Sequence, residues 1–244
     1  MLLMENNKNS RKTNIIEEVK AGKTGYGLLI ERDGHIEGDS NVINQIREDI
    51  SNNQKFVIPD RFIVSAVFQK YDIKNANGRI YPKDVLMREV ERYINECVNT
   101  RSAIGSLDHP ESSTLSGKDV SHNIINLEWR GKTLIGELEL HLSPGYRKYG
   151  IPGTSGDLAA NLILDNIQIG VSSRALGSVE DRFGALIVGD DLELLCWDIV
   201  LNPSTRGSFI AMNRSDLEPY IESKISTKPQ INEKISEINK ILFG

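Results

Sequence analysis

The sequence predicts an α+β protein with a mostly antiparallel, β-barrel-like core wrapped by helices. Several short runs are rich in β-branched and apolar residues or alternate between apolar and polar positions, and turn-forming residues separate them. Only a few stretches show the three- and four-residue spacing of an amphipathic helix. The length of 244 residues suits one substantial core with appendages.

Composition is close to the average for globular proteins and argues against several classes of function. The net charge is −5, and basic residues are scattered among acidic ones, so we expect no direct nucleic-acid binding. No apolar run has the length of a membrane span, and the polar start does not resemble a signal peptide. Cys97 and Cys196 lie far apart without metal-ligand spacing, so we expect reduced thiols, no zinc site and no cofactor.

Residues 1–53 are interpreted as an N-terminal extension. Residues 1–12 are polar and lack periodicity, which favours disorder because they bury too little apolar surface to offset chain entropy. A short apolar run occupies residues 27–30, and residues 42–50 have the spacing of a helix. The compact domain is therefore expected over residues 54–222.

The elements of this compact domain follow in order. Residues 62–68 predict a strand, and Pro82 suits the first turn of a helix that extends to Cys97. Residues 143–155 are expected to be a long loop, followed by a helix over residues 157–164 with Ser155 as its cap. Further strands are predicted at residues 103–107, 123–129, 134–142, 167–174, 185–188 and 193–201.

The last 22 residues, 223–244, form a second appendage. A polar linker leads to residues 231–242, where the isoleucines fall on one helical face. An isolated amphipathic helix behind a linker needs a partner surface, so we expect this tail to dock on another molecule or on the domain itself.

Three segments at the ends of predicted strands could carry chemistry: residues 105–110, 170–177 and 197–204. Acyl transfer needs a nucleophile, a base with a near-neutral pKa and a group that fixes the imidazole tautomer. Ser172, His109 and Asp198 would supply these three parts. The residue types alone do not decide between this chemistry and a structural role.

Five spaced motifs make the pattern specific. They are N-x-N-x-R-x-Y-P from Asn75, G-x-L-x-H-P around His109, W-x-G at Trp129, L-A-A-N at Leu158 and G-V-S-S-R-x-L-G around Ser172. In this order they resemble the prohead core proteases of large tailed phages. The resemblance implies a fold similar to the herpesvirus assemblins and a serine endopeptidase that cleaves after Glu at Leu/Ile-x-Glu sites.

The resemblance also assigns residues to the site. It implies that Ser172 and His109 are the catalytic pair. Asp198 is the preferred third member, because it lies in a strand leading to a Pro-Ser turn, as in related phage proteases. Assemblins use a second histidine instead, so His122 and His141 stay as alternatives.

Removable flanking segments are a further implication of the resemblance. Matching tripeptides end at Glu31 and Glu48 in the extension and at Glu233 and Glu237 in the tail. The expected substrates are the phage scaffold protein, the major capsid protein and these flanking segments. Other prohead core proteins are the expected partners, and the assembling prohead in the host cytoplasm is the expected location. A homodimer is left open.

Two other functions compete with this one. A general cytosolic esterase is disfavoured because the chain lacks a G-x-S-x-G nucleophile motif. The main alternative is a non-catalytic internal scaffold component of the prohead with the same fold. The presence of both His109 and Ser172 in their motifs argues against that loss of activity.

Overall fold

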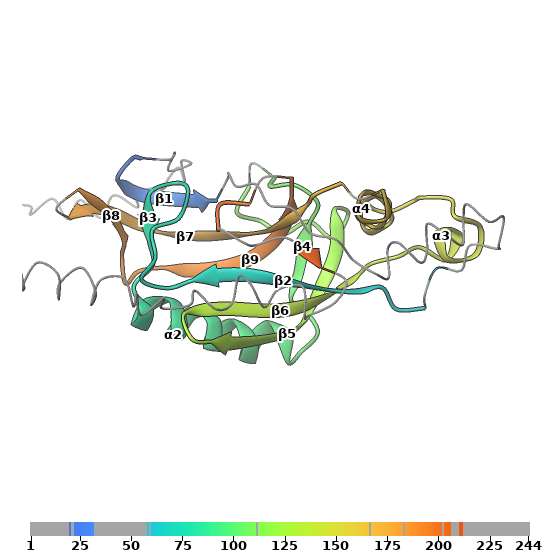
Figure 1. Cartoon of the computed structure of the whole chain (residues 1–244), viewed down its shortest axis with the longest axis horizontal. Helices are drawn as coiled ribbons and strands as arrows, with labels where there is room; N and C mark the ends of the chain where they lie inside the picture. Colours follow the sequence, from blue (N-terminus) through green and yellow to red (C-terminus); the bar gives the residue numbers. More distant parts are fainter. Residues whose placement is uncertain are drawn as a thin grey trace, which may run out of the picture.

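A computed structural model describes residues 20, 22–31, 58, 60–110, 112–165, 167–182, 184–201, 203–205 and 210–211. The helices expected at residues 42–50 and 231–242 lie outside these described residues, as do the sites after Glu48, Glu233 and Glu237. Within the described part, strands dominate and are arranged in two stacked layers, with helices below and at one end (Figure 1).

The first sheet is built around one long strand, β7 (Gly170–Arg182). Three strands pair with β7 in antiparallel fashion: β1 (Gly25–Ile30), β8 (Ala185–Val188) and β9 (Glu193–Val200). The short strand β3 (Arg79–Ile80) pairs in parallel with β8. The apolar run at residues 27–30, which the sequence placed in the extension, thus forms part of this sheet.

The second sheet has five strands in the order β10-β2-β6-β5-β4, and all of its pairs are antiparallel. The strands are β2 (Ile63–Lys70), β4 (Ile104–Ser106), β5 (Val120–Arg130), β6 (Thr133–Leu140) and β10 (Ile210–Ala211). Except for β10, each corresponds to a strand predicted from the sequence.

The described strands do not close into a barrel. A barrel needs a continuous ring of paired strands. Here the two sheets are joined by an isolated parallel bridge between Leu107, just after β4, and Ile199 of β9, and by isolated backbone hydrogen bonds such as that from the Ile210 N–H to the Ile169 carbonyl at 3.0 Å. The expectation of an α+β protein with mostly antiparallel strands is confirmed. The barrel-like closure is not seen.

An aromatic cluster ties the main helix to both sheets. Helix α2 (Lys83–Tyr93) continues into a π-helical turn, η1 (Ile94–Val98), so the predicted helix forms over its whole length. The rings of Tyr93 from α2 and Phe68 from β2 both meet the fully buried Trp197 ring of β9 edge-on, with centroids 5.2 and 5.3 Å away. This cluster fixes β9, which carries Asp198.

The segment between β6 and β7 differs from the prediction. The expected long loop contains a short helix, α3 (Pro144–Tyr149), because Ser143 caps its first turn and Pro144 has a backbone angle suited to that position. The next helix, α4 (Ser155–Leu164), is capped by Thr154 rather than Ser155, in a capping box with Asp157.

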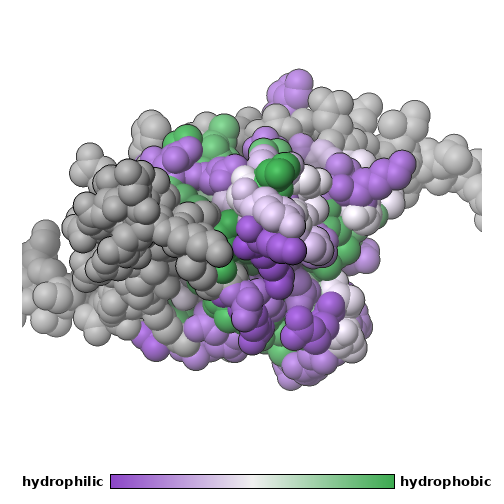
Figure 2. Space-filling model, turned by 90° about the vertical axis from the view of Figure 1, so that its right-hand side faces the viewer, coloured by the Kyte–Doolittle hydropathy of each residue, from purple (hydrophilic) through white to green (hydrophobic). Residues whose placement is uncertain are grey.

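The end of the molecule that carries α3 and α4 shows mostly hydrophilic residues, with hydrophobic ones in small scattered groups (Figure 2). Exposed apolar side chains in these elements and their connections include Tyr149, Ile151 and Leu158. Single exposed apolar residues are ordinary on soluble surfaces. Among the described residues, no helix is both long and apolar enough to cross a membrane.

Candidate active site

Ser172, His109 and Asp198 come together where the two sheets meet. Ser172 in β7 lies directly opposite Asp198 in β9, so their side chains share one face of the sheet. The Nδ1 atom of His109 lies 2.8 Å from Oδ2 of Asp198. A carboxylate can only accept a hydrogen bond, so Nδ1 carries the proton and Nε2 of the neutral ring is left as a base.

The turn after β4 presents His109. Asp108 has a φ of 64°, a left-handed conformation that Asp tolerates better than most residues, and its N–H donates to the Ile199 carbonyl at 2.7 Å. At Gly105 a Cβ atom would collide with the Trp197 carbonyl and the His122 ring. The G-x-L-x-H-P motif therefore combines a close approach of β4 to β9 with a sharp turn into His109.

Asp198 is completely buried, and several donors hold it as an anion. The Ser106 N–H donates to Oδ1 at 2.9 Å, and Arg174 donates from Nε to Oδ2 at 3.0 Å and from Nη2 to Oδ1 at 3.1 Å. Burial alone would raise the pKa of Asp198. The hydrogen bond from His109, the charge of Arg174 and the Ser106 amide outweigh burial and lower that pKa below its usual value.

The backbone of Glu31 occupies the site. Strand β1 runs antiparallel to β7 and ends with Ile30 opposite Arg174, so the next residue reaches the side chains of Ser172 and His109. The Ser172 hydroxyl donates to the Glu31 carbonyl oxygen. His109 Nε2 lies 3.3 Å from the same oxygen. A hydroxyl group and an imidazole nitrogen therefore meet at the carbonyl of a peptide bond.

The side chain of Glu31 is held by the N-x-N-x-R-x-Y motif. Asn75 and Asn77 donate from Nδ2 to Oε2, the former at 2.9 Å, while Arg79 Nη1 at 2.9 Å and the Tyr81 hydroxyl donate to Oε1. The sequence singled out this motif without giving it a role. The signal that could have revealed it was the concentration of four hydrogen-bond donors within seven residues.

The alternative histidines lie elsewhere. His122 is buried, with Nε2 donating to the Trp197 carbonyl at 3.1 Å and Nδ1 2.9 Å from the Ser121 hydroxyl. Burial lowers the pKa of His122 to about 4, although the Asp198 charge and the Trp197 carbonyl act in the opposite direction. His141 is exposed. Of the three candidates for the third member, only Asp198 is hydrogen-bonded to His109 in the described structure.

Potential metal ligands and cysteines are the other reactive groups to place among the described residues. No group of three or more potential ligands there could hold a metal ion. Cys196 accepts from Arg174 Nη2 at 3.2 Å, and both cysteines are free. Burial, reinforced by the Asp198 charge, raises the pKa of the Cys196 thiol, which keeps it protonated and poorly nucleophilic.

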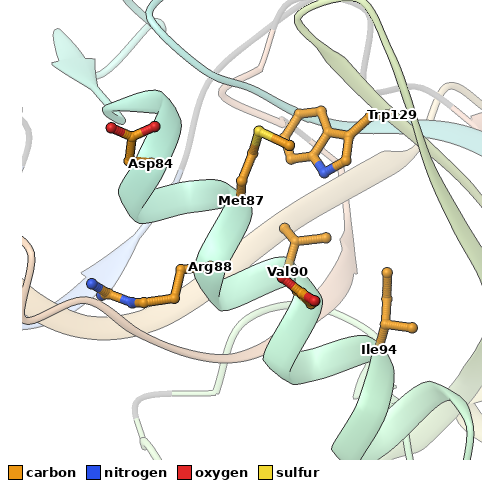
Figure 3. Close-up of a pocket in the computed structure, with 7 residues that line it drawn as sticks. Asp84, Met87, Arg88, Val90, Ile94 and Trp129 are labelled. Atoms are coloured by element: carbon orange, nitrogen blue, oxygen red, sulfur yellow. The ribbon is translucent and has the colours of Figure 1, made fainter.

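A pocket beside α2 is separate from this cluster. The Met87 side chain points toward the Trp129 ring at one end of it (Figure 3). Among the described residues, the side chains that line it make no hydrogen bond or ion pair with Ser172, His109 or Glu31. They are Asp84, Met87, Arg88, Val90, Glu91, Ile94 and Trp129. The pocket contributes to the shape of the α2 surface and not to the cluster at Ser172.

Comparison with known proteins adds evidence of descent. A family model described as "prohead core protein serine protease" matches residues 25–216. The prohead core protein protease of Enterobacteria phage T4 is 32% identical over 149 residues, or 60% of this chain and 66% of that protein, just under two thirds of its length. A solved structure of the bacteriophage T4 capsid assembly protease has a TM-score of 0.52 and 28% identity, covering 71% of this chain and 96% of that one.

Proposed function

Because the chain belongs to the prohead core protein serine proteases, we propose that it is a serine endopeptidase of phage head maturation that cleaves after glutamate. Its substrates would be the scaffold protein, the major capsid protein and its own flanking segments, inside the assembling prohead of the host cytoplasm. One observation supports this above the others: the Glu31 carbonyl lies against both Ser172 and His109.

In the proposed reaction, Ser172 is the nucleophile and His109 the general base. The Ser172 hydroxyl turns its proton to His109 Nε2 while its oxygen bonds to the carbonyl carbon of the glutamate. His109 then gives that proton to the departing amine as the C–N bond breaks. Water, deprotonated by the same Nε2, hydrolyses the acyl ester and frees Ser172. Asp198 holds the imidazole in the required tautomer throughout.

The N-terminal strand supports cleavage at Leu/Ile-x-Glu sites. In Leu29-Ile30-Glu31 the first and last residues match that pattern, and Leu29 is fully buried in the core while the Glu31 side chain is 2% exposed. An enzyme that buries these two side chains would distinguish this tripeptide from the other sequences along the same chain. We therefore propose the bond after Glu31 as one that the enzyme cuts in its own chain.

Intact-mass analysis of the full chain tests this function. The natural chain should lose its first 31 residues over time. Ser172→Ala should keep its full mass, and Ser173→Ala, the matched neighbour in β7, should still be cut. A fluorophosphonate should label the natural chain and Ser173→Ala only. A natural chain that keeps its mass, leaves co-expressed scaffold intact and takes no label would contradict the proposal and favour the non-catalytic scaffold role.

A further inference from the structure

We propose that Asn75, Asn77, Arg79 and Tyr81 form the pocket that selects glutamate on the acyl side of the scissile bond, with Glu31 as its built-in first occupant. This inference rests on the proposed endopeptidase function. It assigns the preference of the enzyme for glutamate to four named residues. The four donors come from a single segment: Asn75 and Asn77 lie in the turn that leads into β3, Arg79 begins β3, and Tyr81 follows it.

The donor set matches a carboxylate. Two donors point at each oxygen, so all four main acceptor positions of the Glu31 side chain are used. Arg79 supplies one positive charge against one negative charge, and neither side chain is more than 2% exposed. A buried charge needs such pairing, because an unpaired one is strongly disfavoured.

The local fold fixes which way the donors point. The amide oxygen of Asn75 accepts the Arg79 N–H at 2.9 Å, which leaves its Nδ2 for Glu31. Arg79 also donates to the Ile30 carbonyl at 3.2 Å, so the guanidinium holds both the side chain and the backbone of the docked strand. The loop is tied down from outside, since the Ala76 N–H donates to the Ser204 carbonyl at 3.1 Å.

This arrangement predicts which side chains are refused. Glutamine has the right length, but its NH2 group would face donors on one side of the pocket and leave them unpaired. Aspartate keeps the charge but is one methylene shorter, so it does not reach both pairs of donors while its carbonyl stays at Ser172. An apolar side chain would leave Arg79 buried without a counter-charge.

Two compensating substitutions in the full chain, Glu31→Gln and Asn77→Asp, test the pocket. The mass of each variant is followed at intervals after induction of expression. Glu31→Gln should slow cleavage after residue 31 by at least about 100-fold, because a buried donor pair is left unsatisfied. Glu31→Asp should be slowed in the same way. Asn77→Asp should restore cleavage of Glu31→Gln by about tenfold or more, since its carboxylate accepts from the glutamine NH2. Asn77→Asp alone should slow cutting after Glu31.

The matched control is Asn99→Asp, an exposed asparagine that should neither slow cleavage of the natural chain after Glu31 nor restore cleavage of the Glu31→Gln variant. Fluorophosphonate labelling of Ser172 in each variant reports the nucleophile independently of the pocket. If the natural chain is cut and labelled while Glu31→Gln or Glu31→Asp is cut equally fast, the pocket assignment is wrong and the endopeptidase function stands. If the natural chain is neither cut nor labelled, the proposed endopeptidase function itself is wrong.

Discussion

Two buried arginine–carboxylate pairs lie close to the Glu31 peptide, and they are built differently. Arg174 and Asp198 are on the adjacent strands β7 and β9, both fully buried. Arg79 and Glu31 are equally buried, but the carboxylate directly follows the terminal strand β1. The first pair is thus a fixed part of the fold. The Arg79–Glu31 pair can be broken by undocking β1 from the sheet. Such a pair suits a position that substrates must enter.

The largest effect is expected from Asp198→Asn. The asparagine cannot hold His109 in the tautomer that leaves Nε2 free, so cleavage after Glu31 should fall about 10³- to 10⁴-fold. Arg174 would also be left buried without its counter-charge, which should lower the free energy of unfolding by about 3–5 kcal/mol. Intact-mass kinetics and urea denaturation measure the two effects.

Matched variants separate these two consequences of losing Asp198. The double variant Asp198→Asn with Arg174→Gln removes both charges and should regain most of the stability, but none of the cleavage. Glu31→Gln, the equivalent change in the other pair, should alter the free energy of unfolding far less, because undocking β1 lets water reach Arg79. Equal destabilisation by Asp198→Asn and Glu31→Gln would refute the distinction between a fixed and an exchangeable pair.

The second prediction concerns the stability of the folded protein at acid pH and the buried His122, which lies near Asp198. The pKa of His122 is about 4 in the folded protein against 6.5 for an ordinary histidine, so the unfolded chain takes up the proton first as the pH falls. Stability should decline between about pH 6.5 and pH 4, by up to about 3 kcal/mol from this residue alone. Thermal unfolding measured across this range gives the slope.

His122→Gln should flatten that slope, because glutamine does not titrate, even if the variant is less stable at pH 7. The control is His141→Gln, which changes an exposed histidine and should keep the natural slope. A slope that is the same in all three chains would mean that the buried His122 does not carry this acid sensitivity.

Much of this organisation follows from local sequence patterns. Apolar and β-branched runs predicted β5, β6 and β9, and the predicted strand ends offered Ser172, His109 and Asp198 as candidates, which the family resemblance then favoured. The short helix α3 was missed because it has six residues and Tyr146 as its one buried side chain, too little for an apolar periodicity to show, although Ser143 and Pro144 provided a start signal. The predicted strand at residues 167–174 stopped too early, because Glu180 and Asp181 in the second half of β7 are exposed and polar.

The contacts of Glu31 could not be predicted in the same way. Its partners Asn77 and Arg79 lie 46 and 48 residues away, and pairing over such a separation depends on the sheet register and not on local periodicity. Two independent hints were present in the sequence: a tripeptide that fits the expected cleavage pattern, and a motif without an assigned role. Only the pairing of β1 with β7 brings the two together.

The smallest effect is expected from Tyr81→Phe. Burial and the nearby Glu31 charge raise the pKa of Tyr81 well above its usual value, so the hydroxyl remains a donor to Oε1. Its loss leaves Arg79 on that oxygen, and cleavage after Glu31 should slow roughly tenfold, the value of one hydrogen bond to a charged group. Tyr146→Phe is the matched control, because its buried hydroxyl donates to Asn161 outside the site. If both variants cut at the natural rate, Tyr81 only supports the fold, and recognition of Glu31 would rest on Arg79 and the two asparagines.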